Sequence, residues 1–331
     1  MPARFRVLLT DRALPDCEVE RRILSAIDAE IVEAPTDDEA TLVALAGDCD
    51  AIATCWARVT ARVIRAAGRC RLIARYGVGL DNICVETATE SGIPVTCVPD
   101  YCVAEVAEHT LALLLSLVRR TTLFDARAKR GDFERRVDPP MRRLEGQTLG
   151  LVGFGRIGQS VFRRAEAFGL NVVATSASGD DHGENCRMIL LNDLLRQSDV
   201  VSLHCPLQDD TRRLIGASQL SRMKSTAFLI NTARGGLVDR DALWTAICNR
   251  RLAGAALDVF DPEPPDLSHP LFSDERVIVS PHAAFLSADS LRELRTRTAR
   301  QIADVLQRRR PEHLVNPEVW PHSRQSAPDV E

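Results

Sequence analysis

The stretch LGLVGFGRIGQS (149–160) decides the fold of this chain. An apolar run leads into three glycines with the spacing Gly-x-Gly-x-x-Gly, at Gly153, Gly155 and Gly158, and a helical pattern follows. Glycines at these positions permit a tight strand-to-helix turn and let backbone N–H groups at a helix N-terminus approach a pyrophosphate. The stretch therefore predicts the first turn of a dinucleotide-binding sheet. A glycine-rich turn without a ligand is the alternative.

Apolar runs that alternate with helical patterns extend from this stretch in both directions. In the second half of the chain, six such runs predict the strands of a full dinucleotide-binding sheet: 148–153, 171–175, 199–205, 227–232, 254–259 and 276–280. In the first half, five more runs predict strands at 5–10, 29–34, 50–55, 71–77 and 93–99. Because helical patterns separate these runs, we expect βαβ units and parallel sheets in both halves.

One helical pattern is longer than a routine connector. Residues 103–130 contain neither Gly nor Pro and predict a single helix between two domains. Shorter helical patterns cover 18–28, 38–47 and 60–67, and a last one covers 287–309. We therefore expect two α/β domains in the chain.

The residue after the second strand of the dinucleotide series departs from the usual pattern. Such sites commonly carry an acidic side chain about 20 residues after the glycines, where it binds the adenosine ribose. Here the stretch NVVATSASG (171–179) places Ser176 at that position, and Asp180, Asp181 and Glu184 follow. Ser176 removes the repulsion of a 2′-phosphate, whereas the acids after it oppose such a phosphate. We expect relaxed selectivity, with NAD favoured over NADP.

Polar side chains follow three later strands of the series. INTARGGLVD carries Arg234, GAALDVFDPEPP carries Asp258 and Glu263, and VIVSPHAAF carries His282. Because the carboxyl ends of the strands of a doubly wound sheet share one edge, where ligands bind, these side chains point to one crevice. Taken singly, a surface arginine, a helix-capping acid and a structural histidine are the alternatives.

Composition bounds the function. The chain has 331 residues, of which 45% are hydrophobic and 27% charged, and a net charge of −4. This balance gives no field that attracts nucleic acid or an anionic membrane. No apolar run is long enough for a signal peptide or a membrane span, so we expect a cytoplasmic protein. The ten cysteines form no CxxC pair and are expected to be reduced core residues, without a metal site.

Together the motifs resemble those of the D-isomer-specific 2-hydroxyacid dehydrogenases, over about residues 5–310. The resemblance rests on ARYGVGLDNI (74–83), AEHTLALLLSLVRR (107–120), GQTLGLVGFGRIG (146–158), VSLHCPL (201–207), INTARGGLVD (230–239), ALDVF with the Glu-Pro that follows it (256–264) and SPHAAF (280–285). VPDYCVAEVAEHT (98–110) and PHAAF look closest to the branch that contains the C-terminal-binding-protein corepressors.

The resemblance implies two Rossmann-like doubly wound domains, with the nucleotide-binding domain inserted into a flavodoxin-like substrate domain. Residues 1–102 and 294–331 would form the substrate-binding domain, and 103–293 the dinucleotide-binding domain. The helix at the start of the second domain often contributes to dimers in this family, so a homodimer is expected.

The resemblance also implies roles for the polar residues. Arg234 would hold the carboxylate of a 2-oxo acid and polarise its carbonyl, and His282 would exchange the proton, with Glu263 as its partner. On the substrate side, the resemblance adds the backbone of Val78 and Gly79, with Arg75 and Phe285 nearby. On the cofactor side, it implies a larger set: Thr110, Gly153, Gly155, Arg156, Ile157, Gly158, Ser176, Cys205, Pro206, Thr211, Thr232, Ala233 and Asp258.

Three positions depart from the family pattern. Ser176 replaces the ribose-binding acid, Cys84 stands where the family often has Asp, and Thr54 stands where phosphoglycerate dehydrogenases commonly carry a phosphate-binding arginine. Arg75 remains as a cation for an extra anionic group on the substrate.

Two functions follow from the resemblance. The first is an enzyme that reduces a small 2-oxo acid to the D-2-hydroxy acid, or catalyses the reverse, with NAD and with NADP also admitted. The second is an NAD(H)-sensing scaffold like the corepressors, with residual dehydrogenase activity. Arg234, Glu263 and His282 are all present, and only a short tail follows the last helical pattern, so we favour the enzyme.

Overall fold

The computed structural model describes residues 3–11 and 16–322, and the chain divides into two compact units. The first unit combines Met1–Tyr101 with Ser287–Glu331, and the second is Cys102–Leu286. The chain returns to the first unit at Ser287, earlier than the residue 294 expected from the sequence. The reason is local: Ser287 caps helix α11 (Ala288–Leu306) in a reciprocal arrangement with Ser290, so the whole helix belongs to the first unit.

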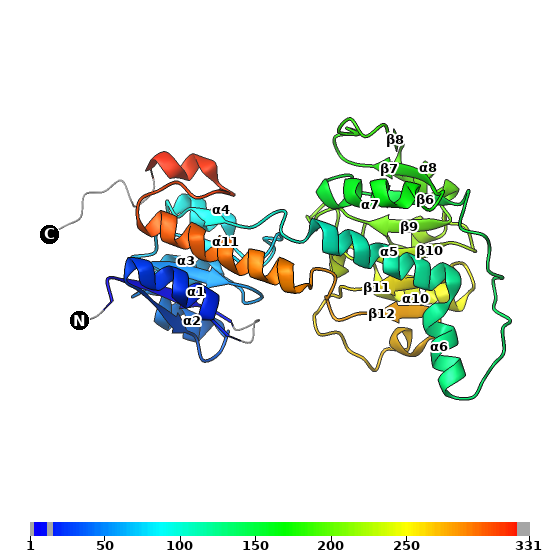
Figure 1. Cartoon of the computed structure of the whole chain (residues 1–331), viewed down its shortest axis with the longest axis horizontal. Helices are drawn as coiled ribbons and strands as arrows, with labels where there is room; N and C mark the ends of the chain where they lie inside the picture. The colour runs from blue at the N-terminus through cyan, green and yellow to red at the C-terminus, as the bar shows by residue number, and fades with distance from the viewer. Residues whose placement is uncertain (1–2, 12–15, 323–331) are drawn as a thin grey trace. The chain divides into compact units, whose positions relative to one another are not determined.

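The first unit has a five-stranded parallel sheet with the order β2-β1-β3-β4-β5, which is the flavodoxin-like order. Its strands are β1 (Phe5–Leu9), β2 (Ala29–Glu33), β3 (Ala51–Thr54), β4 (Ile73–Arg75) and β5 (Val95–Thr96). Helices α2 (Glu39–Ala46), α3 (Ala61–Ala66) and α4 (Val85–Glu90) pack into one hydrophobic core with these strands. Helix α1 (Glu18–Leu24) packs against α11 (Figure 1).

A buried ion pair joins the two sequence segments of the first unit. Arg295 of α11 donates to both carboxylate oxygens of Glu20 on α1, at 2.9 and 2.7 Å, and to Asp16. These hydrogen bonds raise the pKa of Arg295 above its usual value. Further along, the side chain of Asn316 accepts from the amide of Val95 in β5 at 2.8 Å. The C-terminal segment is therefore an integral part of the first sheet unit.

The second unit has a seven-stranded parallel sheet with the order β12-β11-β10-β9-β6-β7-β8. Counted from β6, this is the order 7-6-5-4-1-2-3, the doubly wound arrangement of dinucleotide-binding domains with one strand added. Its strands are β6 (Thr148–Val152), β7 (Asn171–Thr175), β8 (Arg187–Met188), β9 (Val200–Leu203), β10 (Phe228–Asn231), β11 (Gly254–Leu257) and β12 (Val277–Val279). The two-residue edge strand β8 was not predicted from the sequence, and the other six were.

Two helical layers cover this sheet. Helices α5 (Val103–Arg119) and α7 (Arg156–Glu166) pack together on one face, with Phe228 and Ile230 of β10 (Figure 1). Helices α8 (Leu191–Gln197), α9 (Ala217–Leu220) and α10 (Arg240–Cys248) pack with the intervening Leu229. Successive residues of a strand point to opposite faces, so an uninterrupted apolar run serves both layers.

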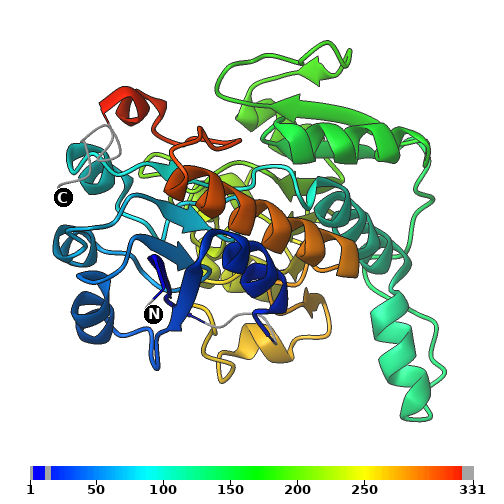
Figure 2. The ribbon, with the colours of Figure 1, turned by 60° about the vertical axis from the view of Figure 1, so that its left-hand side comes forward.

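The predicted single helix at 103–130 is wrong. The chain bends at Arg120, whose φ of 54° is left-handed, and α6 (Thr121–Lys129) leaves the line of α5, as Figure 2 shows. Arg120 is buried, and its guanidinium lies 4.8 Å from the centre of the Phe228 ring. Because neither Gly nor Pro marks the bend, the sequence pattern predicted one continuous helix through this position.

Short 3₁₀ turns complete the described secondary structure at Ser25–Ile27, Gly235–Leu237, Pro270–Ser273 and Pro317–His322. Six of the ten cysteines are buried. Within residues 3–11 and 16–322, no helix has the length and apolar character required to cross a bilayer.

Candidate active site

The glycine-rich turn between β6 and α7 lies where the strand order of the second sheet reverses. Gly153 has a φ of 101°, and a Cβ there would lie 2.5 Å from the backbone of both His204 and Cys205. A Cβ at Gly158 would lie 2.5 Å from the carbonyl oxygen of Gly153. These two glycines are therefore required by close backbone packing.

Gly155 differs from the other two glycines of the motif, Gly153 and Gly158. It caps α7 with a φ of −75°, and a Cβ there would meet no atom within 4 Å. Open space thus adjoins the N-terminus of an 11-residue helix, whose first amides belong to Arg156 and Ile157. Such amides bind anions, so the turn fits the pyrophosphate of a dinucleotide.

Ser176 lies directly after β7 and takes part in a hydrogen-bonded turn. Its hydroxyl accepts from the amide of Gly179 at 3.1 Å and lies 3.3 Å from the hydroxyl of Ser178. In the acidic loop that follows, Arg163 of α7 pairs with Glu184, and this hydrogen bond lowers the pKa of the Glu184 carboxyl. The loop is therefore less negative than its sequence suggests.

The segments after β9 and β10 carry five more of the predicted cofactor residues: Cys205, Pro206, Thr211, Thr232 and Ala233. Thr211 donates to the carbonyl of Pro206 at 2.8 Å and closes that turn, and burial raises the pKa of the Cys205 thiol to about 11. Thr232 lies 3.0 Å from Thr110 on α5. Because the Thr110 hydroxyl donates to the carbonyl of Val106, the Thr232 hydroxyl is the donor to Thr110.

Arg234 follows β10 on a turn that a buried asparagine stabilises. The side chain of Asn231 donates to the carbonyl of Arg234 at 2.8 Å and accepts from the amide of Ala233 at 3.1 Å. Asn231 is fully buried. Sequence reasoning missed this residue, although an asparagine that ends an apolar strand just before the arginine is a usable signal.

His282 and Glu263 form a hydrogen-bonded pair. Nδ1 of His282 lies 2.8 Å from Oε2 of Glu263, and the other carboxylate oxygen accepts from the amide of Phe260 at 2.7 Å. Burial alone would raise the pKa of Glu263, but these hydrogen bonds and the charges of His282 and Arg234 together lower it. The structure therefore brings together the three predicted catalytic side chains.

Asp258 organises the loop that carries His282. Its buried carboxylate accepts from the Ser280 hydroxyl at 2.5 Å and from the amides of Ala283 and Ala284, each at 2.9 Å. Its carbonyl accepts from the amide of His282 at 2.7 Å, where the backbone is left-handed with a φ of 52°. The loop conformation around His282 thus depends on Asp258.

Phe285, the predicted side-chain pocket residue, lies edge-on to the ring of His282, with 6.1 Å between ring centroids. It belongs to the same loop and places an apolar ring beside the imidazole.

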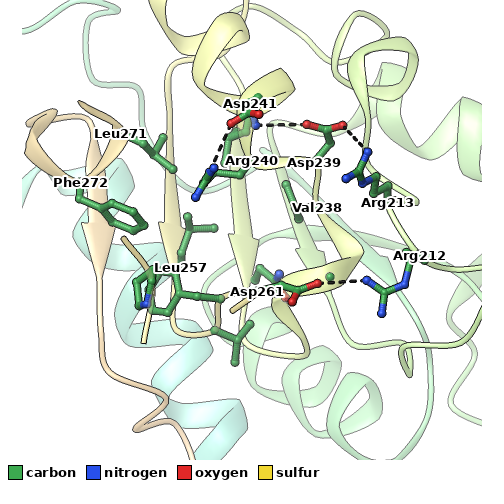
Figure 3. Close-up of a pocket in the computed structure, with 17 residues that line it drawn as sticks. Arg212, Arg213, Val238, Asp239, Arg240, Asp241, Leu257, Asp261, Leu271 and Phe272 are labelled. Atoms are coloured by element: carbon green, nitrogen blue, oxygen red, sulfur yellow. Dashed lines mark hydrogen bonds and ion pairs between the residues drawn. The ribbon is translucent and has the colours of Figure 1, made fainter. Parts of the chain in front are cut away.

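A pocket of about 150 Å³ adjoins the turn that follows Arg234, since Gly235 and Gly236 are among its lining residues. Figure 3 shows the lining. Its residues include Leu257, Leu271 and Phe272, together with Gly235 and Asp261. Arg212 pairs with Asp261 at 3.0 Å, and a Cβ at Gly235 would collide with the backbone of Phe260. These contacts hold the segment before Glu263 against the Arg234 turn. The glycine-rich turn and His282 do not line this pocket, so it is separate from the predicted nucleotide site.

The remaining predicted residues form a turn in the first unit. Arg75 is buried, donates to the carbonyl of Gly79 at 3.0 Å and also donates to the carbonyl of Tyr76. Its guanidinium lies 5.8 Å from the centre of the Trp56 ring. Among the described residues, the amides of Val78 and Gly79 donate to no acceptor. Arg75 therefore shapes the turn, and these two amides are available to an anion.

Comparisons with known proteins agree with this arrangement. A family model described as "D-isomer specific 2-hydroxyacid dehydrogenase, NAD binding domain" matches residues 111–284. A glyoxylate reductase of Korarchaeum cryptofilum is 38% identical over 318 residues, which cover 91% of this chain and 95% of that protein. A D-3-phosphoglycerate dehydrogenase of Methanocaldococcus jannaschii is 40% identical over 263 residues, 78% of this chain but only 50% of that longer protein.

A solved structure adds the cofactor. The D-lactate dehydrogenase of Aquifex aeolicus, crystallised with NAD and lactic acid, superposes with a TM-score of 0.83 at 28% identity, over 98% of this chain and 99% of that chain. These relatives do not test the finer placement near the corepressor branch, which stays a prediction. The matched domain and the shared fold show that the chain belongs to the D-isomer-specific 2-hydroxyacid dehydrogenases, an NAD(P)-dependent family of oxidoreductases.

Proposed function

We propose that this protein reduces a small 2-oxo acid to the D-2-hydroxy acid, or catalyses the reverse oxidation, with Arg234, Glu263 and His282 as its catalytic residues. The observation that carries the proposal is the 2.8 Å contact between His282 and Glu263, with the charge of Arg234 nearby. All three residues follow strands of one parallel sheet, at the edge where such sheets bind ligands.

The hydrogen bond between His282 and Glu263 gives the two ring nitrogens of His282 different roles. A carboxylate only accepts hydrogen bonds, so Nδ1 keeps its proton in both states of the ring. Proton exchange with the substrate therefore falls to Nε2. The lowered pKa of Glu263 keeps that carboxylate charged at neutral pH, and its charge favours the imidazolium that donates the proton during reduction.

Arg234 suits the carboxylate of the substrate. Its planar guanidinium can donate two parallel hydrogen bonds to a carboxylate, or one to the carboxylate and one to the reacting carbonyl. The second arrangement polarises the carbonyl. The side chain of Asn231 donates a 2.8 Å hydrogen bond to the carbonyl of Arg234 and so holds the backbone of this turn. The backbone from which the Arg234 guanidinium extends is therefore fixed.

Several residues would hold the cofactor. A bound NAD(P)H supplies the hydride for the carbonyl carbon of the substrate. The amides of Arg156 and Ile157, beside the open space at Gly155, would bind the pyrophosphate. Ser176 would lie at the ribose. Arg163 is already paired with Glu184 and is thereby less available to a 2′-phosphate, and we propose relaxed selectivity that favours NAD.

The substrate is proposed to be small and without a second anionic group. Arg75 was the cation expected to bind such a group, but its guanidinium donates to the carbonyls of Tyr76 and Gly79. Glyoxylate, the substrate in the name of one relative, is a suitable first compound to assay.

The test is a panel of 2-oxo acids, with oxidation of NADH and of NADPH followed by absorbance. We expect turnover on at least one small 2-oxo acid. His282→Ala should lower kcat by several orders of magnitude with little change in NADH affinity, whereas His313→Ala, a histidine of the first unit, should not. Wild-type protein that binds NADH but reduces none of the acids would refute the proposal and favour the nucleotide-sensing alternative.

A further inference from the structure

His109 on helix α5 lies next to Ser280 and Asp258, and Asp258 is the residue whose hydrogen bonds hold the His282 loop. Its Nε2 lies 3.1 Å from the hydroxyl oxygen of Ser280 and 3.6 Å from Oδ1 of Asp258. Ser280 in turn lies 2.5 Å from the same oxygen of Asp258. All of these residues belong to the second unit. None of the sequence motifs assigned a role to His109 or Ser280.

The direction of these hydrogen bonds follows from the number of protons available. A serine hydroxyl has one proton, and the carboxylate of Asp258 can only accept, so the Ser280 hydroxyl donates to Asp258. Ser280 must then accept at its contact with His109. Nε2 of His109 therefore carries a proton, and the donation runs from His109 through Ser280 to Asp258.

This chain of hydrogen bonds fixes one side of the Asp258 carboxylate. Oδ1 accepts from Ser280 and from the amide of Ala283, which fills its two lone-pair positions. Oδ2 accepts from the amide of Ala284 and retains one acceptor position. The carboxylate is thus held at a defined rotation, with a single acceptor position for a further donor such as a bound carboxamide.

The same contacts hold the loop that carries His282. The amides of Ala283 and Ala284 directly follow His282, which itself has a left-handed backbone and donates to the carbonyl of Asp258. A side chain other than glycine adopts this conformation at an energetic cost, so the surrounding hydrogen bonds must maintain it. A change in the rotation of Asp258 would therefore move His282.

We propose that His109 is a positioning residue for the reaction: its Nε2–H, acting through Ser280, fixes Asp258 and with it the loop of His282. The role in catalysis rests on the proposed function. The structural role does not, since it concerns the loop itself.

The test compares two substitutions at the same position. His109→Gln places an amide N–H near the position of Nε2, whereas His109→Phe keeps a flat ring but has no donor. Glu108→Gln, at the exposed neighbouring position of α5, is the matched control. For each variant, kcat and KM for the 2-oxo acid and the dissociation constant of NADH are measured, together with hydrogen exchange of the amides of Ala283 and Ala284.

His109→Phe should lower kcat about tenfold, as expected when the half-buried Ser280 hydroxyl loses its donor, and should speed the exchange of both amides by a similar factor. His109→Gln should recover most of both effects, and Glu108→Gln should match the wild type. Ser280→Ala alone should impair kcat and speed the exchange of both amides at least as much as His109→Phe, because it removes the donor to Asp258 as well as the acceptor for His109.

Unchanged exchange of Ala283 and Ala284 in His109→Phe would overturn the inference, whatever the activity. Equal impairment of the Gln and Phe variants would also overturn it, because a donor would then not matter. If the wild type reduces no 2-oxo acid, the proposed function fails, but the exchange measurement still decides whether His109 holds the loop.

Discussion

Replacing Gly155 with alanine separates the binding role of the glycine-rich turn from its structural role. The three glycines of this turn look alike in the sequence, yet a Cβ meets no atom within 4 Å at Gly155 and lies 2.5 Å from backbone atoms at both Gly153 and Gly158. The φ of Gly155, −75°, is also normal for alanine. Gly155→Ala should therefore fold normally and fill the space proposed for the pyrophosphate.

Alanine in place of glycine at the start of a helix costs under about 1 kcal/mol, or less than about 4 °C in Tm for a unit of this size. A methyl group between the helix N-terminus and a phosphate should remove at least one charge-assisted hydrogen bond, which is worth about 1.5 kcal/mol or more. We expect the Kd for NADH to rise at least about tenfold.

Gly153→Ala is the contrasting variant. Its Cβ overlaps the backbone at His204 and Cys205, and its φ of 101° is unfavourable for alanine. Overpacking and backbone strain together should cost roughly 3 kcal/mol or more, a fall of about 6–12 °C in Tm.

Thermal unfolding and a fluorescence titration with NADH measure both effects. Binding of NADH by Gly155→Ala as tight as that of the wild type, or an equal loss of stability in the two variants, would contradict the separate roles of these glycines.

Four further predictions follow. Arg234→Lys should lower kcat/KM by at least about tenfold, because an ammonium cannot make the paired hydrogen bonds of a guanidinium; a loss under about threefold would contradict that role. Glu263→Gln removes the negative charge beside His282 that stabilises the proton-donating form of the pair, so kcat/KM for reduction should fall, and an unchanged kcat/KM would count against the pair. Ser176→Asp should strengthen the use of NAD and suppress that of NADP, measured as the ratio of the two kcat/KM values; a wild type that prefers NADP a hundredfold would refute the assignment of the loop. Arg295→Met leaves Glu20 buried and unpaired, so the free energy of unfolding should fall by about 3 kcal/mol in denaturant titrations, and a change near zero would mean that the pair adds no net stability.

The sequence predicted the elements of the fold well because the inner strands, such as β3, β9, β10 and β11, are buried along their whole length and read as uninterrupted apolar runs. Phe228 and Ile230 pack into one helical layer and Leu229 into the other, so successive residues of the strand are all apolar. The bend at Arg120 was missed because neither Gly nor Pro marks it, and the contact of Arg120 with the distant Phe228 leaves no trace in the local sequence.

Individual site residues were predictable where their chemistry is rare. An arginine, a glutamate and a histidine that follow neighbouring strands could be placed together by topology alone. Asn231, Ser280 and His109 could not, because their roles depend on which backbone groups and lone pairs their side chains reach. For Arg75 the sequence suggested a role that the hydrogen bonds do not favour. Its charge suggested a substrate contact, whereas its side chain donates to the backbone of its own turn.

The division of the first unit between the two ends of the chain has a consequence for the order of folding during synthesis. Glu20 and Arg295, which form its buried ion pair, lie 275 positions apart in sequence. When residue 286 has left the ribosome, all residues of the second unit are available, so that unit can fold on its own. The first unit then still lacks α11, and Glu20 has no cation to pair with. A folded second unit holds its own two ends at a fixed separation, which shortens the flexible loop that α11 must close. Folding of the second unit would therefore reduce the loop-closure cost of completing the first unit.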